Sequence, residues 1–214
     1  VVSSVDSFYM SIYEVPEVYY LDDEGKNVDK IIEGIGSLPA AGKDPRKLSW
    51  QDAVNYCNNR TIGIMGIDYN KAGFRLPTKY EWEYAASYNA DDNDKDYSFR
   101  DFDFINRTIA NYYNNDGISR QSVGYFDGEH SDTQDAASFL GIYDLNGNVM
   151  EWCSDEGEYS DDTRICKGGG FLTEGYECRN KNEFTYSKDL SHETIGFRTV
   201  LSADEFLEYW KEEN

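Results

Sequence analysis

The chain has 214 residues, and its 41 acidic side chains outnumber its 20 basic ones to give a formal net charge of −21. A field of that sign repels phosphate backbones and anionic lipid surfaces, so we expect no nucleic-acid partner. Aromatic residues make up 15% of the chain, which argues against disorder, and no run of about 18 apolar residues predicts insertion into a membrane.

The N-terminal part of the chain predicts two strands followed by a helix. Phe8, Met10 and Ile12 alternate with Tyr9 and Ser11, and this period of two predicts a strand with one face in the core. Residues 19–21 predict a second short strand. Ser49 is the predicted N-cap of the helix, with Asp52 at its capping-box position. One apolar face of this helix carries Trp50, Ala53, Val54 and Cys57.

A second helix is predicted after the extended piece that ends at Pro77. Thr78 is its N-cap, Glu81 completes the capping box, and its core-facing positions follow at helical spacing. These positions are Trp82, Ala85 and Ala86. The chain then becomes acidic over residues 89–103 and again over residues 127–135, which indicates solvated loops.

The stretch 141–155, GIYDLNGNVMEWCSD, carries polar side chains at fixed steps around Gly147. These side chains are Asp144, Asn146, Asn148 and Glu151. Carboxylates, together with carbonyls freed at a glycine turn, are the hard oxygen ligands that calcium takes. The alternative is a buried turn whose side chains bond their own backbone without a metal. Asn111 and Asp116, beside a turn at Gly117, form a second and weaker cluster of the same kind.

The C-terminal part opens with a glycine turn at residues 167–170, which predicts a close-packed backbone and not a phosphate-binding loop. Residues 194–201 predict a central strand. Ser202 is the predicted cap of a short terminal helix that carries Glu205 in its capping box. Few helices, short strands and long loops indicate a single α+β domain.

The cysteines and histidines show no metal-ligand spacing. The cysteines are Cys57, Cys153, Cys166 and Cys178. Free buried thiols are the expected state, with one disulfide left open as the alternative. His130 and His192 lie far apart in the sequence, and we expect both to be loop residues.

Several blocks of this sequence resemble the signature blocks of the formylglycine-generating enzyme family. In chain order they are FYMSIYEV, LSWQDAVNYC, FRLPTKYEWEYAA, the 141–152 stretch, KGGGF and IGFRTVL. The resemblance implies a C-type lectin-like fold with a small twisted antiparallel sheet, two main helices and long loops. We therefore expect one domain over residues 1–214, with a core over residues 8–201 and a short helix over residues 202–214.

The resemblance also implies calcium as a cofactor, because members of this family commonly hold it. The first site would use the side chains of Asp144 and Glu151 with the carbonyls of Gly147 and Val149. The second would use the side chains of Asn111 and Asp116 with the carbonyls of Tyr112 and Ile118.

The catalytic residues of the family carry over only in part. Its enzymes oxidise a substrate cysteine with two cysteines, five residues apart just after the glycine turn, which together hold copper. The corresponding positions here are Thr173 and Cys178. A lone thiolate does not form the two-sulfur copper site that soft-ligand chemistry requires, so we expect no copper.

Residues 172–194, hereafter the candidate segment, mix Tyr, Phe, Asn, Ser, Thr and charged residues without a helical or strand period. Such a composition suits a binding surface, as in antibody loops. The segment also resembles the diversified segment of retroelement variable proteins, although its four glutamates depart from the adenine-directed pattern. Its predicted ligand-binding residues are Thr173, Glu174, Tyr176, Glu177, Asn180, Asn182, Phe184, Tyr186, Ser187, Asp189 and His192.

We therefore expect a non-catalytic binding module that presents the candidate segment to a protein or glycan on another surface. Display outside the cell, at a cell surface or on a virion is the corresponding expectation for its location. The competing expectation is a divergent oxidoreductase of the formylglycine-generating type that uses Cys178.

Overall fold

The computed structural model describes residues 6–15, 48–65, 73–88, 95–113, 119–158, 160–203 and 207. The predicted strand at residues 19–21, most of the predicted terminal helix, and two predicted calcium ligands, Asp116 and Ile118, lie outside these ranges. No helix within them is long and apolar enough to cross a bilayer.

Both predicted helices are confirmed, with their caps. The first is α2, Trp50–Met65, where the backbone N–H of Asp52 donates to Ser49 Oγ at 3.2 Å. The second is α3, Lys79–Ser87, where Glu81 and Thr78 form a reciprocal capping box. Each cap satisfies backbone N–H groups that a helix leaves without a partner at its first turn.

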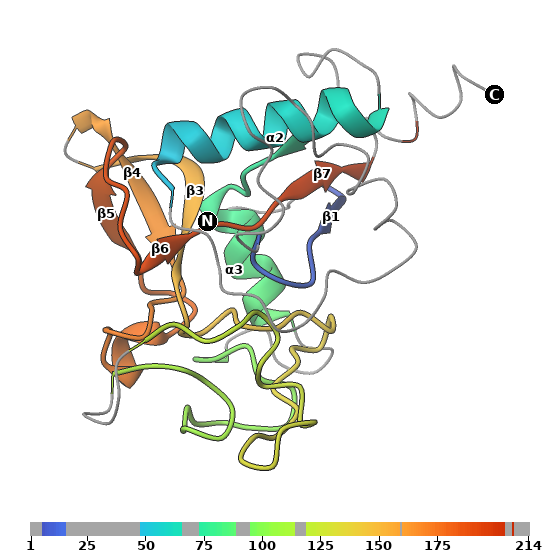
Figure 1. The fold of residues 1–214 in the computed structure, drawn as a ribbon, viewed down its shortest axis with the longest axis vertical. Coiled ribbons are helices and arrows are strands. Elements are labelled where there is room, and N and C mark those ends of the chain that lie inside the picture. Colours follow the sequence, from blue (N-terminus) through green and yellow to red (C-terminus); the bar gives the residue numbers. More distant parts are fainter. Residues whose placement is uncertain are drawn as a thin grey trace.

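The strands form two small sheets (Figure 1). The three-stranded sheet has the order β1-β7-β2, with β1 at Phe8–Met10, β2 at Phe74–Arg75 and β7 at Val200–Ser202, all antiparallel. The four-stranded sheet has the order β5-β4-β3-β6, with β3 at Met150–Gly157, β4 at Ser160–Lys167, β5 at Phe184–Ser187 and β6 at Ile195–Gly196. In it, β6 runs parallel to β3 and the other pairs are antiparallel.

The β3–β4 hairpin separates two hydrophobic clusters. On one face Trp152 and Cys166 pack with residues of α2, and on the other Cys153 and Ile165 pack with Trp82 of α3. Side chains on adjacent strand positions point to opposite faces, which explains how one hairpin serves both clusters. A third cluster lies under the loops between residues 97 and 136, and it includes Cys178. All four cysteines are free and buried, as expected.

The prediction of one strand over residues 194–201 is wrong. The chain forms β6 in one sheet, crosses through Phe197, Arg198 and Thr199, and forms β7 in the centre of the other. All three linking residues are buried. The whole stretch 194–201 is buried because the crossing passes through the core, and its sequence did not reveal the change of sheet.

The candidate segment contains regular structure, although its sequence shows no helical or strand period. It contains a short 3-10 helix, η3, at Gly175–Cys178 and the strand β5. Strand β5 pairs along its whole length with β4, from Cys166↔Phe184 to Thr163↔Ser187. Its side chains belong to a sheet edge and are not those of a free loop.

Candidate functional site

The turn at Gly147 lies directly against Asn111, one of the residues of the second predicted calcium cluster. Gly147 has a φ of +101°, and a Cβ there would collide with the carbonyl oxygen of Asn111. The backbone N–H of Asn148 donates to the same carbonyl at 2.7 Å. Only glycine allows this close approach, so the residue at position 147 is determined by the contact between two loops.

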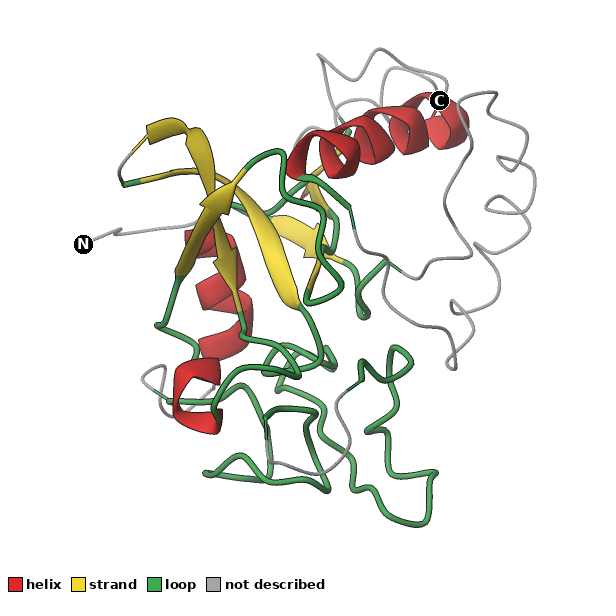
Figure 2. Cartoon of the chain, turned by 60° about the vertical axis from the view of Figure 1, so that its left-hand side comes forward, coloured by secondary structure: helices red, strands yellow, loops and turns green. Residues whose placement is uncertain are grey.

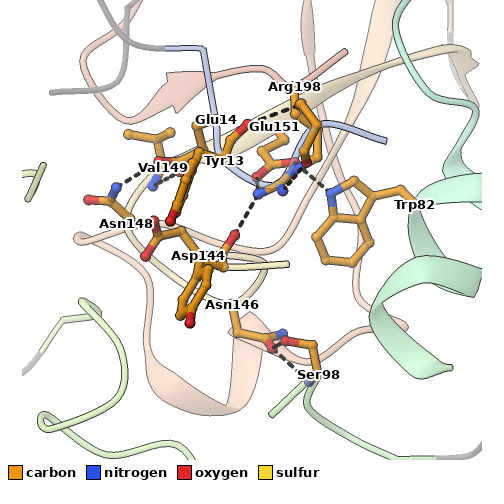
Figure 3. A network of polar contacts seen from close by, with 12 residues as sticks. Tyr13, Glu14, Trp82, Ser98, Asp144, Asn146, Asn148, Val149, Glu151 and Arg198 are labelled. Atoms are coloured by element: carbon orange, nitrogen blue, oxygen red, sulfur yellow. Dashed lines mark hydrogen bonds and ion pairs between the residues drawn. The ribbon is translucent and has the colours of Figure 1, made fainter. Parts of the chain in front are cut away.

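Glu151 lies fully buried in a network of polar contacts (Figure 3). Its Oε1 accepts from Arg198 Nη2 at 2.6 Å, and its Oε2 accepts from Arg198 Nε at 2.7 Å. Trp82 Nε1 also donates to Oε2, at 2.7 Å. A bidentate carboxylate–guanidinium pair has strong directional geometry, and here it joins β3 to the crossing between the two sheets.

Arg198 uses all five of its N–H donors inside the protein. Besides Glu151, Nη1 donates to the carbonyls of Ser11 at 3.1 Å and Ile12 at 3.3 Å, and Nη2 donates to the carbonyl of Tyr143 at 2.9 Å. A buried guanidinium is tolerated when every donor is satisfied. The residue therefore ties four chain segments together.

Glu14 is a member of this network that the sequence did not indicate. Its carboxylate accepts from Asn148 Nδ2 at 2.8 Å, and it faces the motif from the N-terminal segment. Burial, followed by repulsion from Asp144 and Glu151, raises the pKa of Glu14 well above its usual range. Burial likewise raises the pKa of Asp144 to about 6, although the backbone N–H of Gly124 donates to its carboxylate at 2.6 Å.

At the first predicted calcium site, only some of the carboxylate and carbonyl oxygens are available to bind a calcium ion. Glu151 Oε2 already accepts two N–H groups and Oε1 accepts one, so Glu151 could bind the ion through Oε1 alone. The remaining ligands would be Asp144 and the carbonyls of Gly147 and Val149. Among the described residues, no group of three or more His, Cys, Asp and Glu is placed to hold a metal. Calcium remains a prediction.

Thr173 and Cys178, the positions that correspond to the copper-binding pair, both lie close to Gly169 of the glycine turn. A Cβ on Gly169 would lie 2.6 Å from Cys178 Sγ and 3.2 Å from Thr173 Cγ2. Cys178 is buried, and burial, together with the charges of Glu177 and Glu174, raises the pKa of its thiol to about 12. The thiolate, which is the reactive form, is therefore scarce at neutral pH.

The predicted ligand-binding residues fall into three groups by exposure. The exposed ones are Glu174, Tyr176, Ser187, Asp189 and His192. The partly buried ones are Glu177, Asn182, Phe184 and Tyr186. The buried ones are Thr173 and Asn180, and we assign both to the scaffold.

Asn180 links the candidate segment to three distant parts of the chain. Its Nδ2 donates to the carbonyls of Ala86 at 3.2 Å and Lys95 at 3.1 Å, and its Oδ1 accepts from Asn146 Nδ2 at 2.9 Å. Asn146 in turn accepts from the backbone N–H of Ser98 at 2.8 Å. Asn180, which was predicted to bind a ligand, and its partner Asn146 instead satisfy buried backbone groups.

The exposed members of the candidate segment lie at two separate places. At η3, Tyr97 donates its hydroxyl to the carbonyl of Gly175 at 3.0 Å, which holds this helix against the loops. After β5, the carbonyl of Lys188 accepts from the N–H of Trp50 at 3.0 Å, beside the first turn of α2. Figure 1 shows η3 below the four-stranded sheet and the first turn of α2 beside the upper part of the sheet. The sequence did not predict that the exposed residues of the candidate segment lie at two separate places.

Comparison with known proteins establishes the family. Residues 2–203 match the sulfatase-modifying factor enzyme 1-like domain. The chain belongs to this domain family. The match confirms the resemblance seen in the sequence blocks, and the two helices and small sheets confirm the expected α+β, C-type lectin-like fold of the formylglycine-generating type.

Two curated proteins illustrate the range of this family. The chain is 27% identical to the chaperone protein LppX of Paenibacillus barcinonensis, over 79% of this chain and 71% of that protein. It is also 27% identical to the formylglycine-generating enzyme of Mus musculus, over 71% of this chain but only 42% of the enzyme. Membership of the family therefore does not by itself assign an activity to this chain.

Two solved structures show the same fold. The crystal structure of CarF superposes with a TM-score of 0.66, at 19% identity, over 92% of this chain and 87% of that one. Treponema denticola variable protein 1 superposes with a TM-score of 0.56, at 20% identity, over 73% of this chain and 70% of that one. At such low identity these similarities establish the fold of the chain and not its ligand.

Proposed function

We propose that the chain is a non-catalytic binding module of the sulfatase-modifying factor enzyme 1-like family, displayed at a cell surface or on a virion. Its ligand is a protein or glycan on another surface. The observation that carries this proposal is the contrast between two residues two positions apart. Tyr176 is 62% exposed, whereas Cys178, the remaining counterpart of the enzymes' copper-binding pair, is buried.

The competing activity, oxidation of a substrate cysteine, lacks its chemical requirements at this position. Thr173 offers a hydroxyl where a second thiolate is needed, and its Oγ1 accepts from the N–H of Gly170 at 3.0 Å. The high pKa of Cys178 disfavours the thiolate that copper would bind. Incubation with copper and a sulfatase-type cysteine peptide should give no aldehyde. Turnover that Cys178→Ser abolishes would overturn the proposal.

The scaffold supports binding at low entropic cost. The candidate segment is fixed at η3, at the buried Asn180 and along β5, so its exposed side chains project from an ordered backbone. Ordering a loop on binding costs about 0.5–1.5 kcal/mol for each side chain that is immobilised, and a fixed segment avoids part of this cost. An exposed tyrosine on such a segment is the type of residue that dominates binding energy.

The test is binding of the full, labelled chain to arrays of glycans and of cell-surface proteins. Tyr176→Ala should weaken binding by about 2 kcal/mol, the loss typical of an aromatic anchor. Tyr80→Ala, which removes a tyrosine that is 44% exposed on α3, is the matched control and should have no effect. Equal loss in both variants, or binding to nothing on either array, would contradict the proposal.

Diversification of the segment has a separate test. If sibling copies of the gene vary, we expect the variation at exposed positions such as Tyr176, Asp189 and His192. Asn180 and Cys178 should be constant, because both are buried in contacts with the scaffold. Variation that includes Asn180 would show that the segment is not diversified within this fold.

A further inference from the structure

Exposed apolar side chains gather around η3. Phe104 is 79% exposed on the loop that packs against η3, Leu172 is 44% exposed just before this helix, and Tyr176 is 62% exposed on the helix itself. Large apolar groups are exposed singly on most proteins, but a group of them marks an interaction site. Together with Glu174 and Glu177, these three residues define what we call the η3 patch.

Backbone and side-chain contacts hold the loop that carries Phe104 against η3. A Cβ on Gly175 would lie 2.9 Å from Ile105 Cγ2 and 3.2 Å from Tyr112 Cε2, so the loop after Phe104 packs directly under η3. The N–H of Tyr113 donates to the carbonyl of Thr173 at 2.9 Å. Figure 2 shows the short helix against these loops at the lower end of the molecule.

Two basic side chains near the patch are paired with carboxylates, whereas the two glutamates of the patch pair with no described residue. Arg179 pairs with Asp96 at 3.4 Å, and Lys95 pairs with Asp103 at 3.6 Å, so these two basic groups are already engaged by carboxylates. Glu174 and Glu177 form no ion pair with any described residue, and they lie close enough to Cys178 to raise its pKa. The whole chain adds to this field with its net charge of −21.

We propose that the η3 patch binds a basic segment of a partner protein, one that carries arginine or lysine. This inference rests on the proposed function and names the chemistry of the ligand. A guanidinium or ammonium group binds the face of an exposed aromatic ring, and Tyr176 and Phe104 offer two such rings. Glu174 and Glu177 supply carboxylates for charge-assisted hydrogen bonds. Anionic ligands are repelled, and a neutral glycan gains no charge–charge attraction from the two carboxylates.

The experiment uses the full chain and two short synthetic peptides as probes. One peptide alternates arginine with glycine, and in the other glutamine replaces each arginine. The arginine peptide should bind, the glutamine peptide should not, and affinity should fall as ionic strength rises. Glu174→Gln combined with Glu177→Gln should weaken binding about fivefold, the effect expected for two exposed ion pairs.

The matched control removes two charges elsewhere. Glu158→Gln combined with Asp161→Asn neutralises two exposed carboxylates at the β3–β4 hairpin, at the opposite end of the sheet from η3 (Figure 1). This variant should bind like the unaltered chain. Equal weakening in both double variants would show that the peptide responds to net charge alone, and equal binding of the two peptides would show no recognition of cations. Either result overturns the proposal.

A further outcome separates this inference from the proposed function. Binding on the protein or glycan arrays that requires Tyr176 but is indifferent to salt would overturn the cationic partner and leave the binding module standing. Melting curves of both double variants should match that of the unaltered chain, because the substituted side chains form no ion pair or hydrogen bond with another residue of the described ranges.

Discussion

At the scale of single residues, buried polar side chains connect parts of the chain that lie far apart in sequence. Arg198 joins β3 to the segment after β1, and Asn180 joins η3 to α3 and to the loop at Lys95. Both have their donors satisfied by carbonyl or carboxylate oxygens. Such groups favour one folded structure over alternative packings, because moving one of these side chains leaves several buried partners unpaired.

Asn180→Ala should therefore destabilise the fold by about 2–4 kcal/mol, since it removes the buried donor that the carbonyls of Ala86 and Lys95 share and one of the two acceptors of the Asn146 amide. Chemical denaturation followed by fluorescence measures this loss. Asn182→Ala is the control within the same segment. It removes two bonds from a partly exposed side chain and should cost less than about 1 kcal/mol. Equal losses would contradict the scaffold role of Asn180.

At the scale of elements, β5 changes how the candidate segment must be interpreted. Phe184 and Tyr186 alternate along this strand and pack against the cluster beneath the sheet, where they stabilise the domain. Tyr176 lies on η3 and packs against no such cluster among the described residues. Two tyrosines of one segment thus have different roles, one in packing and one at the surface.

This difference predicts opposite results for two substitutions of the same kind. Tyr186→Ala should lower the free energy of unfolding by about 2 kcal/mol, because it removes a large aromatic ring from the cluster. Tyr176→Ala should change it by no more than about 0.5 kcal/mol, as is usual for an exposed side chain. Thermal melting of the two variants checks the prediction. An unchanged free energy of unfolding for Tyr186→Ala would show that the ring of Tyr186 does not stabilise the cluster.

At the scale of the whole molecule, negative charge is the dominant electrostatic feature. The buried network holds three carboxyl groups, those of Glu14, Asp144 and Glu151, against the single guanidinium of Arg198. Burial raises the pKa of Glu14 and Asp144, which reduces their charge. A bound calcium ion would offset the same charge without protonation, and this is the physical reason to test for it.

Calcium that binds the folded chain should stabilise it by about 2.7 kcal/mol at a hundredfold excess over the dissociation constant. Adding a chelator should then lower the melting temperature. Asp144→Asn is the best control, because asparagine tolerates the positive φ of 60° at this position and only the charge is lost. Its melting temperature should not respond to the chelator. Glu151→Gln is unsuitable, since it also disrupts the pair with Arg198.

An unaltered chain whose melting temperature ignores the chelator would disprove the first calcium site. The structure already limits that site to one oxygen of Glu151, which calcium would share with the bond from Arg198 Nη2. Isothermal titration with calcium provides an independent measurement of the same binding.

The sequence alone determined the family, the fold class and both capped helices. These features depend on local rules: Thr78 and Glu81 bond to each other three residues apart, and the buried face of α3 follows helical spacing. The glycine turn at residues 167–170 was also predictable, since Gly168 and Gly169 both have positive φ. Local geometry needs no knowledge of distant residues.

Only the tertiary structure decided which polar residues are available for binding. Asn180 and Tyr176 are both of residue types that are common in binding surfaces. Asn180 is nevertheless buried by contacts with Ala86 and Lys95, whereas Tyr176 projects into solvent. In the same way, the partner of Glu151 lies 47 residues further along the chain at Arg198. Burial and pairing depend on which segments meet in space, and a single sequence does not contain that information in its spacing.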